Sequence, residues 1–148
     1  MGRVKRKRGD GKPSPVTWAT AHCEATSTGW HCVIPTPLSA NRIWRNGRGR
    51  TYEAKQHGSD KSEAVKRWGK SAKVYGDVAL RIVWVRPARR GDLDNFAVKP
   101  VLDILKGVFF DDDSQVAELQ VLRVDDATRA PGVYVWIFPA DEPKVEAA

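Results

Sequence analysis

The sequence has few of the features that mark secreted or membrane proteins. Its 148 residues include only two cysteines, too few for a disulfide framework, and we expect both to be reduced thiols. No apolar run approaches the ~20 residues that a membrane-spanning helix requires. The basic N-terminus is followed by Gly-Asp-Gly-Lys-Pro instead of an apolar stretch, so it does not read as a signal peptide. We therefore expect a cytoplasmic protein with no membrane partner.

The chain does have enough apolar surface for one core. Hydrophobic residues make up 41 %, aromatic residues 9 %, and there are six tryptophans, a composition that excludes wholesale disorder. The length suits one compact domain. No internal repeat is visible. We expect a basic, flexible N-terminal extension over residues 1–28, an ordered domain over 29–140 and a C-terminal tail over 141–148.

The net charge of +7 is distributed unevenly. Residues 1–12 hold six basic residues and one acidic residue, and residues 41–73 hold ten basic and three acidic residues. From Lys99 to the end, ten acidic residues outnumber five basic ones. The basic segments suit a polyanionic partner. The acidic surplus downstream must serve something else, and cation binding is one candidate.

The apolar pattern predicts alternating strands and helices. We expect strands at 30–34, 78–84, 115–124 and 132–138, and helices at 59–73 and 95–106, with an Arg- and Gly-rich loop over 45–58. The pattern of 115–124 fits a helix almost as well. The last two strands are close enough to form a hairpin. This order predicts a two-layer α+β domain with helices packed on a mixed or mainly antiparallel sheet, with α/β as the alternative.

Two groups of carboxylates carry the strongest chemical signal. Asp92 and Asp94 lie at a strand-to-helix junction, where alternation points both side chains to one side. Asp111–Asp113 lies at the next junction, which shares an end of the sheet with the first if the helix between them returns along it. Carboxylates gathered in this way repel one another, and Mg²⁺, which prefers hard oxygen ligands, would relieve the repulsion.

The residues around the carboxylates suit phosphodiester hydrolysis. Carboxylate-held Mg²⁺ can activate water and neutralise charge, Lys99 can stabilise charge on the phosphate, and Arg89 and Arg90 can hold flanking phosphates. Simpler interpretations stand beside this one. Asp94 or Asn95 can cap the helix, and Asp111–Asp113 can be an ordinary acidic turn. For Asp103, an ion pair with Lys99 or Lys106 is favoured over a place in the metal site.

These residues, in this order, resemble the RusA family of Holliday-junction resolvases. The resemblance rests on Asp92-Leu-Asp-Asn95, then Lys99 and Asp103, then Asp112-Asp113-Ser-Gln-Val116. Upstream, Ile34-Pro-Thr-Pro-Leu-Ser-Ala-Asn-Arg-Ile-Trp44 is similar to the family's opening strand and turn. One departure is that Lys99 follows Asn95 by four residues where the family usually has three, and we expect the extra residue in the turn before the helix.

The resemblance implies a Mg²⁺-dependent, homodimeric endonuclease that nicks four-way DNA junctions symmetrically in recombination and repair. It implies that Asp92, Asp94 and Asp113 bind the metal and that Lys99 is catalytic. As a cluster beside such a motif, further residues are expected to contact the DNA backbone: Asn41, Arg42, Arg45, Arg48 and Arg50. The alternatives are a nuclease for other branched DNA or for RNA, and a non-catalytic DNA-binding protein whose acidic cluster is structural.

Overall fold

The structure is a computed structural model that describes residues 13–37, 44–47, 50–53, 55–86 and 98–140. Strands and helices alternate irregularly along these segments. Their bounds are β1 His22–Ala25, β2 Trp30–Ile34, β3 Trp44–Gly47, β4 Arg50–Glu53, α2 Lys55–Trp68, β5 Val78–Arg86, α3 Val98–Leu105, the 3₁₀ turn η2 Asp113–Gln115, β6 Val116–Asp125 and β7 Gly132–Pro139.

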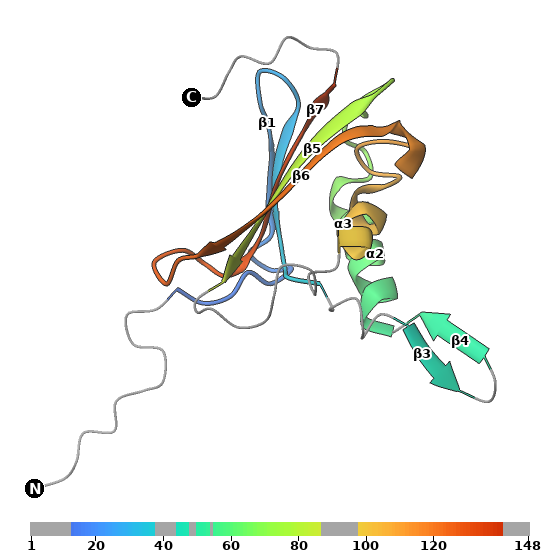
Figure 1. Cartoon of the computed structure of the whole chain (residues 1–148), viewed down its shortest axis with the longest axis vertical. Coiled ribbons are helices and arrows are strands. Elements are labelled where there is room, and N and C mark those ends of the chain that lie inside the picture. The colour runs from blue at the N-terminus through green and yellow to red at the C-terminus, as the bar shows by residue number, and fades with distance from the viewer. Residues whose placement is uncertain (1–12, 38–43, 48–49, 54, 87–97, 141–148) are drawn as a thin grey trace, which may run out of the picture.

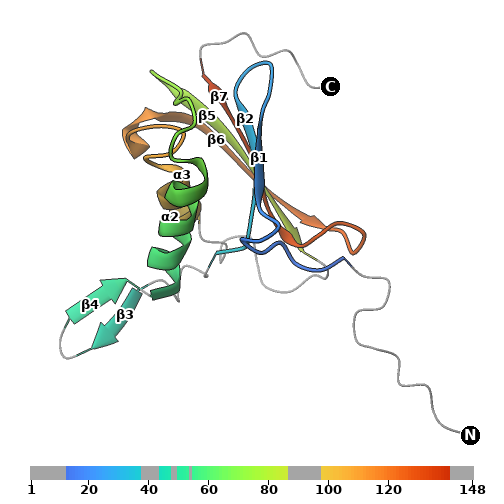
Figure 2. The ribbon, with the colours of Figure 1, turned by 180° about the vertical axis from the view of Figure 1, so that it is seen from behind.

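One five-stranded sheet organises the fold, in the order β1-β2-β7-β5-β6. β5 and β6 are parallel, whereas every other neighbouring pair in this sheet is antiparallel. The two helices α2 and α3 lie on the same side of the sheet, as opposite views show (Figure 1, Figure 2). This arrangement confirms the predicted two-layer α+β architecture with a mixed sheet. It does not match the α/β alternative, because only one pair of strands is parallel.

The core between α3 and the sheet fixes the acidic turn in place. α3 buries Val101, Ile104 and Leu105 at helical spacing. Gly107 follows with φ of 80°, the left-handed conformation in which a glycine commonly ends a helix. Phe109 and Phe110 are then fully buried in the core. Because Phe110 directly precedes Asp111, burial of these aromatic rings anchors the segment that carries the three aspartates.

Helix α2 begins and ends earlier than predicted. It runs from Lys55 to Trp68, so Ser59, at the predicted start, lies inside the helix, and the helix stops short of Lys73, the predicted end. Its buried residues are His57, Asp60 and Ala64, which recur at helical spacing. Two of these three residues are polar. An apolar pattern therefore does not reveal the first turn, which was assigned to a loop.

The Arg- and Gly-rich stretch also contains regular structure. β3 and β4 pair as an antiparallel hairpin with Gly47 opposite Arg50. This hairpin projects away from the five-stranded sheet, beside the first turn of α2 (Figure 1). Each strand has only four residues, too short a run for the apolar alternation that identifies strands from sequence.

The predicted hairpin between the last two strands is wrong. β6 pairs with β5 in parallel, and β7 lies on the other side of β5. The parallel pair needs a crossover connection, which contains α3. Most of β6 is exposed or half-buried because it is an edge strand, and this explains why its apolar pattern was ambiguous.

The fold begins before Gly29, where the ordered domain was expected to start. Val16 is buried, and its backbone N–H donates to the Pro131 carbonyl at 2.8 Å. β1 pairs with β2 and places Cys23 opposite Cys32. Both cysteines are free thiols, with Sγ atoms 2.8 Å apart. Residues 1–12 and 141–148, assigned to the extension and the tail, lie outside the described residues. Within the described chain, no helix is long and apolar enough to cross a membrane.

The two faces of β7 differ in their environment. Val133, Val135 and Ile137 are fully buried in the core beneath the helices. On the opposite face Trp136 is only partly buried and stacks on the His31 ring at a centroid distance of 4.3 Å. The Arg81 guanidinium lies 5.7 Å from the Trp136 ring on the other side. Trp136 is therefore the centre of an aromatic and cationic row on the face that α2 and α3 do not cover.

Candidate active site

The three aspartates of the acidic turn have different environments. Asp111 forms an ion pair with Lys73 at 2.6 Å. Asp112 is the N-cap of η2, where its side chain accepts a hydrogen bond from the Ser114 N–H and the Gln115 side chain completes a capping box. Asp111 and Asp112 therefore have structural partners of their own. The alternative that the acidic turn is an ordinary structural turn therefore fits Asp111 and Asp112.

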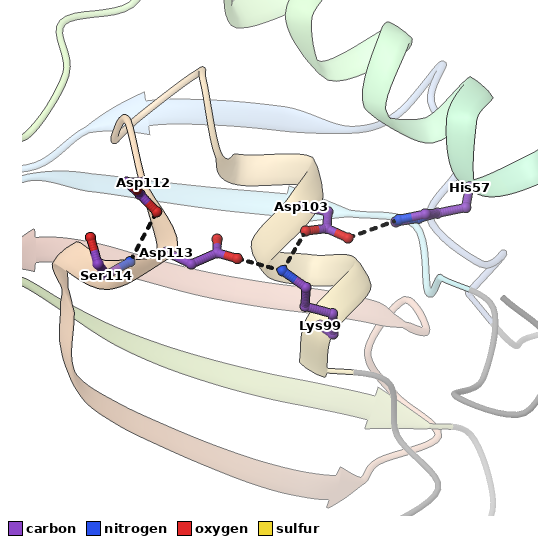
Figure 3. Close-up of polar contacts among 6 residues, drawn as sticks. All are labelled: His57, Lys99, Asp103, Asp112, Asp113 and Ser114. Carbon is purple, nitrogen blue, oxygen red and sulfur yellow. Dashed lines mark hydrogen bonds and ion pairs between the residues drawn. The ribbon is translucent and has the colours of Figure 1, made fainter. Parts of the chain in front are cut away.

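Asp113 is the aspartate that faces α3. Its Oδ2 accepts a hydrogen bond from the Lys99 ammonium, drawn in Figure 3. Its Oδ1 is buried and has no hydrogen-bond partner among the residues that the structure describes. A buried carboxylate oxygen without a partner is costly unless a donor or a cation reaches it. Asp113 thus presents one oxygen that is suited to a metal ion beside the oxygen held by lysine.

Lys99 lies between two carboxylates. Its Nζ is 3.0 Å from Oδ1 of Asp103, one turn along α3, and also contacts Asp113 (Figure 3). Of the two ion-pair partners predicted for Asp103, Lys99 and Lys106, the structure shows the pair with Lys99. Hydrogen bonds to Asp113 and to Asp103 raise the pKa of the Lys99 ammonium above its usual value. The side chain is 60 % exposed, so the cation is held in place while it stays accessible from solvent.

A histidine on α2 also contacts Asp103, so that His57, Asp103, Lys99 and Asp113 form a row of polar contacts. The His57 side chain, only 2 % exposed, donates from Nε2 to Oδ2 of Asp103 at 3.1 Å. Burial alone would raise the pKa of Asp103, but hydrogen bonds from Lys99 and His57 outweigh burial and lower it below the usual value. His57 was not among the predicted site residues, and it falls in the stretch 45–58 that was predicted to be a loop. Its spacing to Asp60 and Ala64 on one helical face was the available signal.

Most of the other predicted site residues lie outside the described residues. These are Asp92, Asp94, Arg89, Arg90, Asn41, Arg42 and Arg48. Arg45 and Arg50 belong to β3 and β4, whose backbone alone is described. Among the described residues, no three His, Cys, Asp or Glu side chains gather closely enough to hold a metal ion. A metal site that includes Asp113 therefore requires ligands from beyond these segments.

Parallel pairing separates the two strand ends that flank α3. The register pairs Val78 with Val116 and Arg86 with Asp125, so β5 ends at one end of the sheet and β6 begins at the other. The expectation that both junctions begin from the same end of the sheet is therefore wrong. The acidic turn instead meets α3 at its second residue, Lys99, five positions after Asp94 in the sequence.

Comparison with known proteins agrees with this combination of fold and side chains. A protein-family model described as endodeoxyribonuclease RusA, a class of nucleases, matches residues 34–138, which include the five-stranded sheet from Ile34 onward, both helices and the acidic turn. The chain belongs to the RusA family. It is also similar to a crossover junction endodeoxyribonuclease rusA of Enterobacteria phage 82, with 30 % identity over 99 residues, covering 64 % of this chain and 82 % of the relative.

Proposed function

We propose that the protein is a Mg²⁺-dependent endodeoxyribonuclease that resolves Holliday junctions by paired, symmetric nicks in recombination and repair. Family membership over residues 34–138 supports an endodeoxyribonuclease. The phage relative is named for cleavage of crossover junctions, which supports the branched substrate. The single observation that carries the proposal within the structure is the contact of Lys99 with Asp113, since it joins the two elements of the motif that resembles the family.

In the proposed mechanism, Asp113 would hold the metal ion together with Asp92 and Asp94. The donor set fits, because carboxylate oxygens are the ligands that Mg²⁺ prefers and Oδ1 of Asp113 is buried without a described partner. When bound, Mg²⁺ supplies an activated water and neutralises charge on the phosphate and the leaving oxygen. The Lys99 ammonium, held by Asp103 and Asp113, stabilises the negative charge that develops on the phosphate.

The basic residues of the chain are assigned to the DNA backbone. Arg89 and Arg90 would hold the phosphates that flank the cleaved bond, as bidentate guanidinium contacts allow. Residues in and around the β3–β4 hairpin would contact phosphates further along the arms: Asn41, Arg42, Arg45, Arg48 and Arg50. The hairpin projects from the body of the fold in both views, so its residues could contact DNA at a distance from the sheet (Figure 1, Figure 2).

Cleavage of a synthetic four-way junction tests the proposed function. We expect Mg²⁺ to support nicks at symmetry-related positions in two opposing strands, and EDTA to abolish them. Linear duplex, a flapped DNA and a duplex RNA serve as controls. Cleavage of flaps or RNA in preference to the junction would favour a different branched or RNA substrate. Tight junction binding without any cleavage would favour a non-catalytic DNA-binding protein.

We propose that the active form is a homodimer. The chain has a single copy of the Asp92-Leu-Asp-Asn95 motif and no internal repeat, so one copy of the chain supplies one active site, whereas a junction needs two opposed nicks. A two-fold dimer presents two sites related as the strands are related. The face of the sheet centred on Trp136 is the proposed interface, because it combines a partly buried tryptophan with a stacked His31 and a cationic Arg81.

Substitution of Trp136 by glutamate tests this interface. We expect the wild-type protein to sediment near twice the 16.5 kDa chain mass at micromolar concentration. Trp136→Glu removes an aromatic anchor worth at least about 2 kcal/mol and should weaken the dimer at least about thirtyfold. Tyr75→Glu is the matched control, since Tyr75 is 79 % exposed and lies outside the sheet. A wild-type protein that is monomeric both free and on a junction contradicts the dimer.

A further inference from the structure

His57 connects helix α2 to the lysine of the candidate site through a single intervening carboxylate. It lies in the first turn of α2, and its side chain is 2 % exposed. Asp103 lies on α3, and Nε2 of His57 is 3.1 Å from its Oδ2. The other oxygen of the same carboxylate, Oδ1, is 3.0 Å from Nζ of Lys99. Both oxygens of Asp103 are therefore engaged, one by each residue (Figure 3).

The chemistry of these groups determines which of them donates and which accepts in each hydrogen bond of the row. The low pKa of Asp103 keeps its carboxylate ionised at neutral pH, and an ionised carboxylate only accepts hydrogen bonds. Nε2 of His57 must therefore carry the proton and donate it to Oδ2. The Lys99 ammonium donates to Asp103 on one side and to Asp113 on the other. The row thus runs from a buried donor, through an acceptor, to an exposed cation.

We propose that His57 is a positioning residue for cleavage: by holding Asp103 from α2, it orients the carboxylate that keeps the Lys99 ammonium at Asp113. The inference rests on the proposed function, because it concerns the same lysine. Lys99 is 60 % exposed, and a free lysine side chain loses rotamer entropy when it is fixed. Asp103 lies on the same helix as Lys99, so the bond from His57 is the contact in this row that ties the lysine to a second, packed helix.

A purely structural role is the competing explanation. In that case the bond between His57 and Asp103 only joins α2 to α3, and its loss would lower stability without a specific effect on cleavage. The two explanations differ in whether a replacement that keeps the Nε2 donor restores the reaction rate. They also differ in whether changes at His57 and at Asp103 act independently.

Two substitutions of His57 separate these explanations. In His57→Gln the amide nitrogen can take the place of Nε2 and donate to Asp103. In His57→Leu the buried volume is retained, but the donor is lost. We expect His57→Leu to lower the single-turnover rate on a junction about 10- to 100-fold, the usual range for residues that orient an active-site group, with junction affinity unchanged. His57→Gln should cleave within about threefold of wild type.

A double-mutant cycle gives a second measurement. Asp103→Ala should lower the rate at least as much as His57→Leu, and the double variant should be no slower than Asp103→Ala alone, since both changes act through Lys99. Asp103 is partly exposed, so its truncation tests the same contact if His57→Leu fails to fold. The inference is overturned if His57→Leu cleaves like wild type, if His57→Gln is as slow as His57→Leu, or if the two losses are additive.

A spectroscopic readout keeps this test independent of the proposed function. In protein labelled with ¹⁵N-lysine, free of metal and DNA, hydrogen bonds to two carboxylates should slow proton exchange of the Lys99 ammonium enough for its signal to be observed. Lys99→Arg assigns the signal. It should persist in His57→Gln and broaden in His57→Leu. A wild-type protein that leaves junctions intact overturns the proposed function, whereas a Lys99 signal unchanged in His57→Leu overturns the positioning role.

Discussion

Asp113→Asn is expected to abolish junction cleavage while junction binding is retained. The substitution keeps the shape of the side chain but removes its negative charge. That charge is shared by the oxygen that binds Lys99 and by the buried Oδ1. Loss of a metal ligand that contributes about 4 kcal/mol to the transition state corresponds to a rate at least about a thousandfold lower. Binding should be equal or tighter, since a negative charge near the DNA is lost. The single-turnover rate and the junction dissociation constant are the two measurements.

Asp111→Asn is the matched control for this experiment. It makes the same chemical change two residues away, but Asp111 is paired with Lys73 and is 61 % exposed. We expect its cleavage rate to stay within about fivefold of wild type, because an exposed ion pair contributes ~1 kcal/mol or less. An Asp113→Asn variant that cleaves like wild type would contradict the assignment of Asp113 as a ligand. Asp92→Asn and Asp94→Asn should reproduce the loss seen with Asp113→Asn.

Lys99 and Asp113 are site residues that could be identified from the sequence. Both residues were selected from their order in the motif, and the structure places them in contact. The ion pair between Lys99 and Asp103 also followed from helical spacing, a local property that sequence reveals directly. The three neighbouring aspartates differ in their partners: Asp112 caps its own turn, whereas Asp111 and Asp113 bind lysines from other segments of the chain. Lys73, for example, is 38 residues from Asp111.

Features that depend on the pairing of segments far apart in the chain could not be predicted from the sequence. The parallel pairing of β5 with β6 and the insertion of β7 between β2 and β5 are set by the packing of whole strands. Nothing local in 115–138 separates this arrangement from a hairpin. His57 was missed for a related reason. Its role depends on Asp103, 46 residues away, and on a helix whose first buried residues are polar.

Lys99→Gln is expected to separate cleavage from stability more sharply than any other single substitution in the described chain. Removing an electrostatic stabiliser of the transition state typically lowers the rate about 100- to 1,000-fold. Stability should change by ~1 kcal/mol or less, because Lys99 is 60 % exposed and its ion pairs are screened by solvent. Lys73→Gln is the control, because it removes the same charge from a lysine that takes no part in the Lys99–Asp113 contact. Lys73 is 32 % exposed and forms an ion pair with Asp111. Both variants should bind junctions with similar affinity and unfold at similar urea concentrations, while only Lys99→Gln loses cleavage. Equal cleavage by the two variants would show that Lys99 acts as one more surface charge and would remove it from the mechanism.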